Sequence, residues 1–285
     1  MAGRFSRSWS LMKASAAVLR SDKSLLMFPL ASSICCLLVA ASFLIPIGAA
    51  FAAAAPEAGT HHRALSTGAY VALFLFYLTQ YFVIIFFNTA LAGAALSRLR
   101  GEPTSFADGF ALARQRVVSI FGYALIAATV GLVLRALQER LGLLGRLVAG
   151  FLGLAWTVAT FLVVPVLASQ EVGPVDAVKR SVELLKRTWG ENLIGNAGIG
   201  VVFGLLFVLA VLVSAGLIMG AFALQSIAAV VVAFATVAIG LTLLGLVQAS
   251  LQGIYAAALY RYAEEGQVGH GFDQAMLEQA FRLKK

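Results

Sequence analysis

Residues 193–220 read LIGNAGIGVVFGLLFVLAVLVSAGLIMG, and residues 227–259 read IAAVVVAFATVAIGLTLLGLVQASLQGIYAAAL. Neither stretch contains Asp, Glu, Lys or Arg. Each exceeds the roughly 20 apolar residues that a helix needs to cross about 30 Å of hydrocarbon. Only residues 221–226 separate the two stretches, so they predict a hairpin of two membrane-spanning helices.

Four more apolar stretches of this kind precede the pair. The six predicted spans cover residues 25–51, 69–96, 117–134, 147–168, 193–220 and 227–259, and turn signals stand at 56–59, 142–146 and 221–226. Of the 285 residues, 61% are hydrophobic and 12% charged, whereas ordinary soluble domains carry about 25% charge. We therefore expect an all-α polytopic membrane protein with six transmembrane helices arranged as three hairpins.

The basic residues are concentrated in every second segment outside the spans. The N-terminal segment, the second loop, the fourth loop and the tail hold 17 of the 21 Lys and Arg residues, and Arg63, Arg135, Arg140 and Arg146 lie in the other loops. Short loops that are rich in Lys and Arg stay in the cytoplasm. The pattern predicts a multi-pass protein of a prokaryotic plasma membrane with both termini in the cytoplasm. The first span is too long for the apolar region of a cleaved signal peptide, so we expect it to be retained.

A helical period predicts a cytoplasmic amphipathic helix before each hairpin. The segment Arg7–Lys13, RSWSLMK, recurs as Arg180–Lys186, RSVELLK. Spacings of three and four residues place apolar side chains on one face of each helix: Phe5, Trp9, Met12, Ala16 and Leu19; then Phe106, Phe110, Ala113 and Val117; then Val175, Val178, Val182, Leu185 and Trp189. A single membrane domain over 1–285 thus divides into pseudo-repeats at 4–97, 104–169 and 173–262, followed by a cytoplasmic tail at 263–285.

These helices favour contact with anionic lipid headgroups or with a protein partner. The candidate contact residues are Arg7, Lys13, Arg114, Arg116, Lys179, Arg180, Lys186 and Arg187. The alternative, in which the helices only pack against the ends of the spans, is left open. The net charge of +8 is spread between spans, which favours membrane topology over nucleic-acid binding.

Several segments carry a resemblance to a known family. They are Phe161-Leu-Val-Val-Pro165-Val, Glu171-Val-Gly-Pro174, Lys179-Arg-Ser181, Thr188-Trp-Gly-Glu191, the N-terminal RSWSLMK with Leu25-Leu-Met-Phe-Pro29-Leu, and Phe86-Phe-Asn88-Thr-Ala-Leu91. The chain resembles a bacterial and archaeal family of six-span membrane proteins catalogued as a domain of unknown function. It is more distantly similar to the membrane domain of some glycerophosphodiester phosphodiesterases, although their catalytic domain is lacking. The resemblance implies the architecture and brings no functional residues with it.

The spans contain uncharged polar residues and almost no ionisable ones. Asn88, Asn196 and Gln248 are the candidates for a polar pathway, while hydrogen bonding between helices is the commoner role of such residues. Pro165 predicts a kink in the fourth span, with a carbonyl left for water, an ion or a neighbouring hydroxyl. The adjacent cysteines and the histidines lack metal-ligand spacing, so we expect no metal, no cofactor and no enzymatic activity.

The leading hypothesis is a non-enzymatic membrane protein whose basic helices engage anionic lipid and a partner of unknown identity. The alternative is a channel or facilitator for a small solute, and an enzyme that acts on lipid ranks last. The pairs Gly200 with Gly204 and Gly216 with Gly220 fit a homo-oligomer and fit internal packing equally well.

Overall fold

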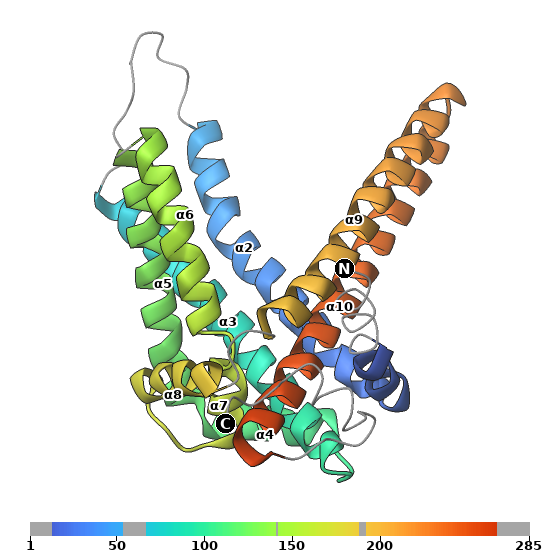
Figure 1. The fold of residues 1–285 in the computed structure, drawn as a ribbon. Helices are drawn as coiled ribbons and strands as arrows, with labels where there is room; N and C mark the ends of the chain where they lie inside the picture. Colours follow the sequence, from blue (N-terminus) through green and yellow to red (C-terminus); the bar gives the residue numbers. More distant parts are fainter. Residues whose placement is uncertain (1–12, 54–66, 141, 188–191, 267–285) are drawn as a thin grey trace. The chain divides into compact units, whose positions relative to one another are not determined.

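The structure is a computed structural model, and it describes residues 13–53, 67–140, 142–187 and 192–266 (Figure 1). Every regular element within these ranges is a helix. Residues 13–21 are helical, and the elements that follow are η1 Lys23–Leu26, α2 Met27–Ala53, α3 Thr67–Leu99, α4 Phe106–Gln115, α5 Val117–Arg140, α6 Gly142–Ala159, α7 Val163–Ser169, α8 Pro174–Arg187, α9 Asn192–Ala223 and α10 Ile227–Glu265.

Six stretches of the described chain are long and apolar enough to cross a membrane, as predicted. They are Lys23–Pro46, Val71–Leu99, Val117–Glu139, Gly145–Ser169, Val202–Ala223 and Ile227–Glu265. The fourth consists of two helices, α6 and α7, because the helix breaks before Pro165. The turn expected at residues 142–146 is wrong, since α6 begins at Gly142. A glycine costs a helix only about 1 kcal/mol, and a continuous helix keeps the backbone hydrogen-bonded as the chain enters lipid.

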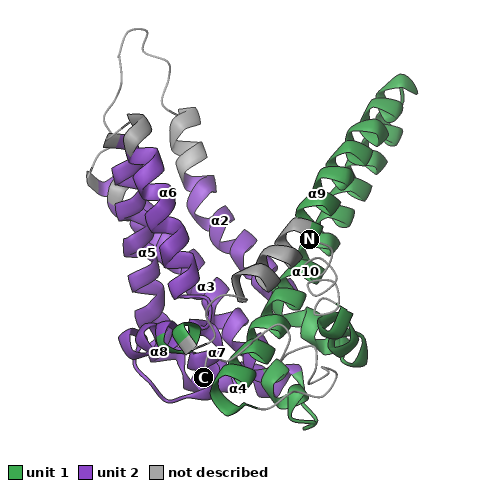
Figure 2. Cartoon of the chain, in the orientation of Figure 1, with its two compact units in different colours: residues 1–29, 94–105, 183–285 green, residues 30–93, 106–182 purple. Residues whose placement is uncertain are grey.

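The chain forms two compact units (Figure 2). Unit 1 comprises residues 1–29, 94–105 and 183–285, and unit 2 comprises residues 30–93 and 106–182. In unit 1, α9 packs along α10, and η1 contacts α10. In unit 2, α5 packs along α6, and α4 contacts α5.

The hairpin of α9 and α10 turns within three residues. The Ser226 hydroxyl accepts a hydrogen bond from the Ala229 N–H at 3.4 Å, which caps the start of α10. Gln225 has a positive φ of 50°, a conformation that favours glycine. A tight connection of this kind keeps both helices antiparallel along their length.

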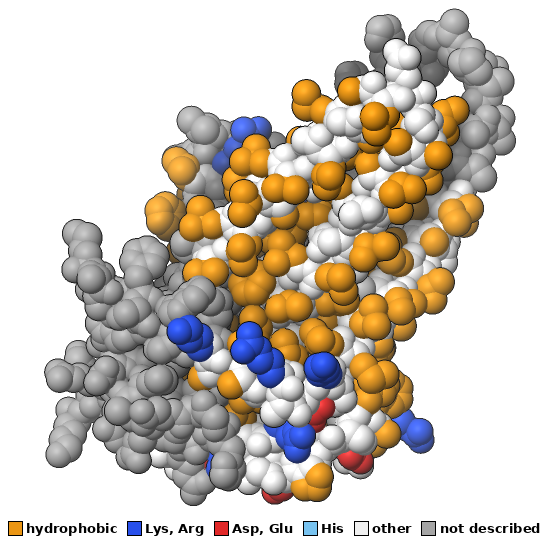
Figure 3. All heavy atoms as spheres, turned by 90° about the vertical axis from the view of Figure 1, so that its right-hand side faces the viewer, with side chains coloured by type: hydrophobic (Ala, Val, Ile, Leu, Met, Phe, Trp, Pro, Cys, Tyr) orange, Lys and Arg blue, Asp and Glu red, His pale blue; other side chains and the backbone are white. Residues whose placement is uncertain are grey.

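The surface of this hairpin is apolar. Leu212 is 65% exposed, Met219 71% and Val232 64%. On the face shown in Figure 3, hydrophobic side chains cover most of the upper part, and basic and acidic side chains gather toward the lower end. Water-soluble monomers rarely expose apolar patches of more than a few hundred Å². The protein is therefore embedded in a membrane, where lipid covers these side chains.

The pseudo-repeats stay a prediction. Apart from Lys13, the first copy of the RSxxLxK motif lies outside the described residues, so the two copies are not comparable in structure.

Candidate functional site at the charged helix ends

Helix α8 has two contrasting sides. Ala177, Ser181 and Leu184 have no exposed surface, whereas Lys179 and Lys186 are exposed. The predicted apolar stripe is divided between the two sides: Leu185 is buried, Val178 and Val182 are half-buried, and Val175 is 54% exposed. Small side chains such as Ala177 and Ser181 let another helix approach closely, which explains why they form the buried side. The valine stripe and the two lysines are left on the outer side.

The buried side of α8 meets the break in the fourth span. The Ser181 hydroxyl donates a hydrogen bond to the Ala159 carbonyl at 2.7 Å and accepts one from the Leu162 N–H at 3.1 Å. A neighbouring hydroxyl, one of the three partners that the sequence suggested for a freed carbonyl, thus binds the Ala159 carbonyl. The carbonyl that loses its helical donor to Pro165 itself is that of Phe161.

The segment between α7 and α8 is held by contacts with α5 and with Arg116, the residue that precedes α5. Arg116 forms an ion pair with Glu171 at 2.7 Å, and the Ser119 hydroxyl donates to the Val172 carbonyl at 2.8 Å. A Cβ at Gly122 would lie 2.8 Å from the Pro174 Cγ, so the missing side chain allows α8 to begin there. Arg116, a predicted headgroup contact, is held within the protein and is 19% exposed.

Helix α4 packs against α3 through aromatic rings. The centre of the Phe110 ring lies 5.2 Å from that of the Phe86 ring in an edge-on arrangement. The Leu112 side chain packs closely against Gly93, where an added Cβ would lie only 3.0 Å from it. Arg114 is exposed. Helix α4 therefore contacts α3 on one side, while Phe110 stays 38% exposed.

Unit 1 contains an ion pair that the sequence analysis missed. The Asp22 carboxylate lies 2.9 Å from Nε of Arg98 in the last turn of α3. It also accepts hydrogen bonds from the Ser24 N–H at 3.0 Å and the Ser24 hydroxyl at 2.6 Å, which caps η1. One acidic residue thus starts η1 and holds the end of α3.

A second charged cluster lies at the same end of α3. Arg261 is buried and donates hydrogen bonds to the Leu99 carbonyl and, at 3.1 Å, to Glu265. Arg100 joins Glu265 from the other side at 2.8 Å. Leu99 ends α3, where a helix leaves carbonyls without intrahelical partners. The only advance signal was the spacing of four residues between Arg261 and Glu265.

The other predicted contact residues are placed as follows. Lys13 is exposed and Arg180 half-buried. Lys179 lies 3.3 Å from Asp176 across an exposed surface. Arg7 and the side chain of Arg187 lie outside the described residues.

The predicted polar pathway stays a prediction. Asn88 is half-buried in unit 2 and Gln248 half-buried in unit 1, and the side chain of Asn196 is not among those described. The commoner role of polar residues in spans is seen at Gln80 of α3, whose amide donates to the Cys36 carbonyl of α2 at 3.0 Å.

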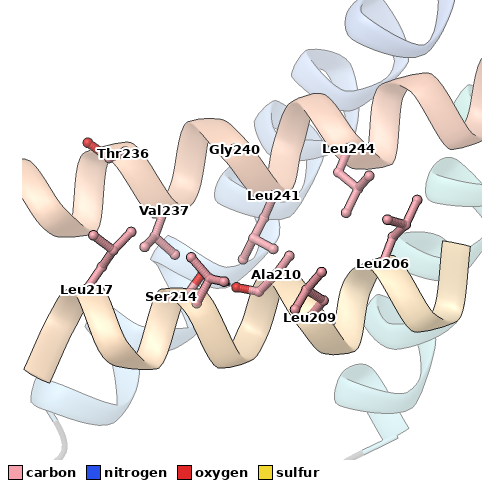
Figure 4. A pocket seen from close by; sticks show the side chains of 11 residues that line it. Leu206, Leu209, Ala210, Ser214, Leu217, Thr236, Val237, Gly240, Leu241 and Leu244 are labelled. Atoms are coloured by element: carbon pink, nitrogen blue, oxygen red, sulfur yellow. The ribbon is translucent and has the colours of Figure 1, made fainter.

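A groove of about 440 Å³ runs between α9 and α10 (Figure 4). Its walls are Leu206, Leu209, Ala210, Val213, Ser214, Leu217, Thr236, Val237, Gly240, Leu241 and Leu244. The Ser214 hydroxyl donates to the Ala210 carbonyl at 2.6 Å, and that of Thr236 to the Val232 carbonyl at 2.8 Å. Both hydroxyl protons are thus used within their own helices, so the groove has the character of a site for hydrocarbon. In the part of the chain that is described, no three His, Cys, Asp or Glu side chains gather to hold a metal ion.

A family model matches residues 67–272, well over half of the chain. The chain belongs to DUF6159, a family of unknown function. The DUF6159 match includes α4, α8 and the Arg261 cluster. No significant match was found among curated proteins or among solved structures. These comparisons give no support to the more distant similarity to the membrane domain of glycerophosphodiester phosphodiesterases.

Proposed function

We propose that this DUF6159 protein is a non-enzymatic protein of the prokaryotic plasma membrane, whose basic helix α8 binds anionic lipid headgroups on the cytoplasmic side. Both termini lie on that side in the proposal, as the distribution of Lys and Arg predicts. A protein partner with an acidic surface would meet the same helix.

The observation that carries the proposal is the outer side of α8. Lys179 and Lys186 lie seven residues apart, two turns along one side of the helix, next to the exposed Val175 and the half-buried Val182. Apolar side chains beside lysines are the pattern by which helices lie at the boundary between headgroups and hydrocarbon. Two carboxylates reduce the effect of the lysines: Asp176 forms an exposed ion pair with Lys179 at 3.3 Å, and the exposed Glu183 lies one helical turn from both lysines.

The experiment measures lipid preference of the full chain in liposomes with spin-labelled phosphatidylglycerol and phosphatidylcholine. A basic residue near an anionic surface contributes about 1 kcal/mol. Because Asp176 and Glu183 offset part of the charge of both lysines, the double substitution Lys179→Gln with Lys186→Gln should lower the preference for phosphatidylglycerol by about fivefold. An unchanged preference would refute the proposal.

Two variants serve as controls. Arg146→Gln removes an exposed cation from the predicted outer side, and it should leave the preference for lipid in the cytoplasmic leaflet unchanged. Asp176→Asn removes the charge opposite Lys179 and should strengthen the preference. A loss in Asp176→Asn equal to that of the lysine variant would point to damage to α8 rather than to charge.

A further inference from the structure

The break in the fourth span leaves backbone groups without their usual partners. In a continuous helix the Ala159 carbonyl would accept from the Val163 N–H, but that N–H donates to the Thr160 carbonyl at 3.1 Å. The Leu162 N–H would donate to the Val158 carbonyl, which accepts from the Phe161 N–H instead, at 3.2 Å. The Ala159 carbonyl and the Leu162 N–H therefore both lose their helical partners at the break.

Pro165 explains why the break lies here. Proline has no N–H and its ring clashes with the carbonyl four residues earlier, which disrupts the turn before it. Leu162, Val163 and Val166 have no exposed surface, so the displaced N–H of Leu162 is buried, while Ala159 is half-buried. An unsatisfied backbone group buried in this way is costly, and a broken helix at membrane depth is tolerated only where the protein or a water-filled cavity supplies partners.

Ser181 supplies both missing partners with one hydroxyl. It donates to Ala159 at 2.7 Å and accepts from Leu162 at 3.1 Å, and it is fully buried. Because Ser181 lies in the middle of α8, these two bonds join α8 to the point where the fourth span bends. The start of α8 is fixed separately, by the contact of Pro174 with Gly122 on α5.

We propose that Ser181 is the positioning residue that sets the bend of the fourth span, and that it transmits the placement of α8 on the membrane surface to that span. The second part rests on the proposed function, in which Lys179 and Lys186 hold α8 on headgroups. Ser181 is also the serine of the RSxxLxK motif. The helical period of the motif does not require a serine there, whereas the two hydrogen bonds to the fourth span do.

The main test compares Ser181→Ala with Ser169→Ala. The Ser169 hydroxyl also bonds to backbone, at 2.8 Å from the Pro165 carbonyl, but within its own helix. Hydrogen exchange at the Leu162 amide should become about five- to tenfold faster in Ser181→Ala and stay unchanged in Ser169→Ala. Equal exchange at Leu162 in wild type and Ser181→Ala would overturn the proposal.

A distance measurement tests the transmission. Spin labels replace Phe151 on α6 and Val175 on α8, which are 72% and 54% exposed, in a chain whose two cysteines are changed to alanine. Wild type should give a distance distribution with one peak, and the width of that peak should decrease when phosphatidylglycerol is added to phosphatidylcholine vesicles. Ser181→Ala should give a broad distribution that anionic lipid does not narrow. A wild-type distribution in Ser181→Ala would refute the positioning role.

The two proposals fail separately. If the lysine variant keeps its lipid preference while Ser181→Ala broadens the distance, the headgroup function and the transmission are refuted and the positioning role stands. If Ser181→Ala does not assemble, Pro165→Ala is added to it, because an N–H at position 165 lets α6 and α7 join and relieves the need for the hydroxyl. Recovery of folding in Pro165→Ala with Ser181→Ala is expected, and no recovery would refute the link between Ser181 and the break.

Discussion

Replacing Arg261 by methionine should destabilise the protein by about 2 kcal/mol, which is far more than the loss of a surface charge. Arg261 is 8% exposed. It is the side-chain donor for the carbonyl of Leu99 at the end of α3, and it also bonds to Glu265. Methionine keeps the unbranched stem and removes the charge and every donor, so the substitution removes the polar contacts of Arg261 and keeps much of its packing.

The size of the effect follows from what each partner loses. Removing one member of an isolated buried ion pair costs about 3–5 kcal/mol. That full cost does not apply, because Glu265 keeps Arg100 at 2.8 Å and is 28% exposed. The Leu99 carbonyl loses its side-chain donor, at about 1–3 kcal/mol, and the loss of the ion pair adds about 0.5 kcal/mol. Lysine in Arg261→Lys keeps the charge but reaches fewer acceptors than arginine. The loss of stability in Arg261→Lys should therefore be smaller than that in Arg261→Met.

The assay is equilibrium unfolding of the full chain in mixed micelles, followed by circular dichroism. Arg135→Gln is the exposed control: Arg135 also pairs with a glutamate four residues later, at 3.0 Å, and donates to the Tyr77 hydroxyl at 2.9 Å, but both members of the ion pair are more than half exposed. The control should change the free energy of unfolding by no more than about 0.5 kcal/mol. Equal losses in Arg261→Met and Arg135→Gln would refute the conclusion that the buried cluster stabilises the end of α3.

Three further outcomes are expected. Gly122→Ala should destabilise the protein by about 1–3 kcal/mol, because its Cβ would lie 2.8 Å from Pro174, and unfolding in mixed micelles measures the loss. Gln225→Gly should stabilise it by about 1 kcal/mol in the same assay, since Gln225 has φ 50°; a loss would refute the strain. Single cysteines at Arg146 and Lys179, in a chain without its native pair, should react with a membrane-impermeant maleimide from opposite sides of the membrane, and labelling from one side would refute the predicted topology.

The spans were predictable because length and hydropathy alone decide them. The fourth span shows the limit of that signal: Pro165 indicated a kink, but its bonding partner, Ser181, lies on another helix and follows only from the fold. The sequence did not identify the buried side of α8, for a related reason. Hydropathy ranks Val175 and Val178 above Ala177 and Ser181, whereas close contact between helices favours small side chains.

The charged residues show why a topology signal is not by itself a map of lipid contacts. Arg98, Arg100 and Arg261 lie in the segments that the distribution of Lys and Arg assigns to the cytoplasm, and in the structure each is paired with an acidic side chain of unit 1. A pairing of this kind does not weaken the topology argument, because Asp and Glu contribute little to orientation.

Contact with headgroups has a different requirement, since it depends on the cations that are exposed after folding. Arg116, at 19% exposure and paired with Glu171, is a poor candidate for such contact. Lys179, Lys186 and Arg114 keep exposed side chains. Arg114 is a single exposed cation on α4, whereas the two lysines lie together on one face of α8 beside exposed apolar surface, so α8 is where substitutions should separate lipid binding from membrane orientation.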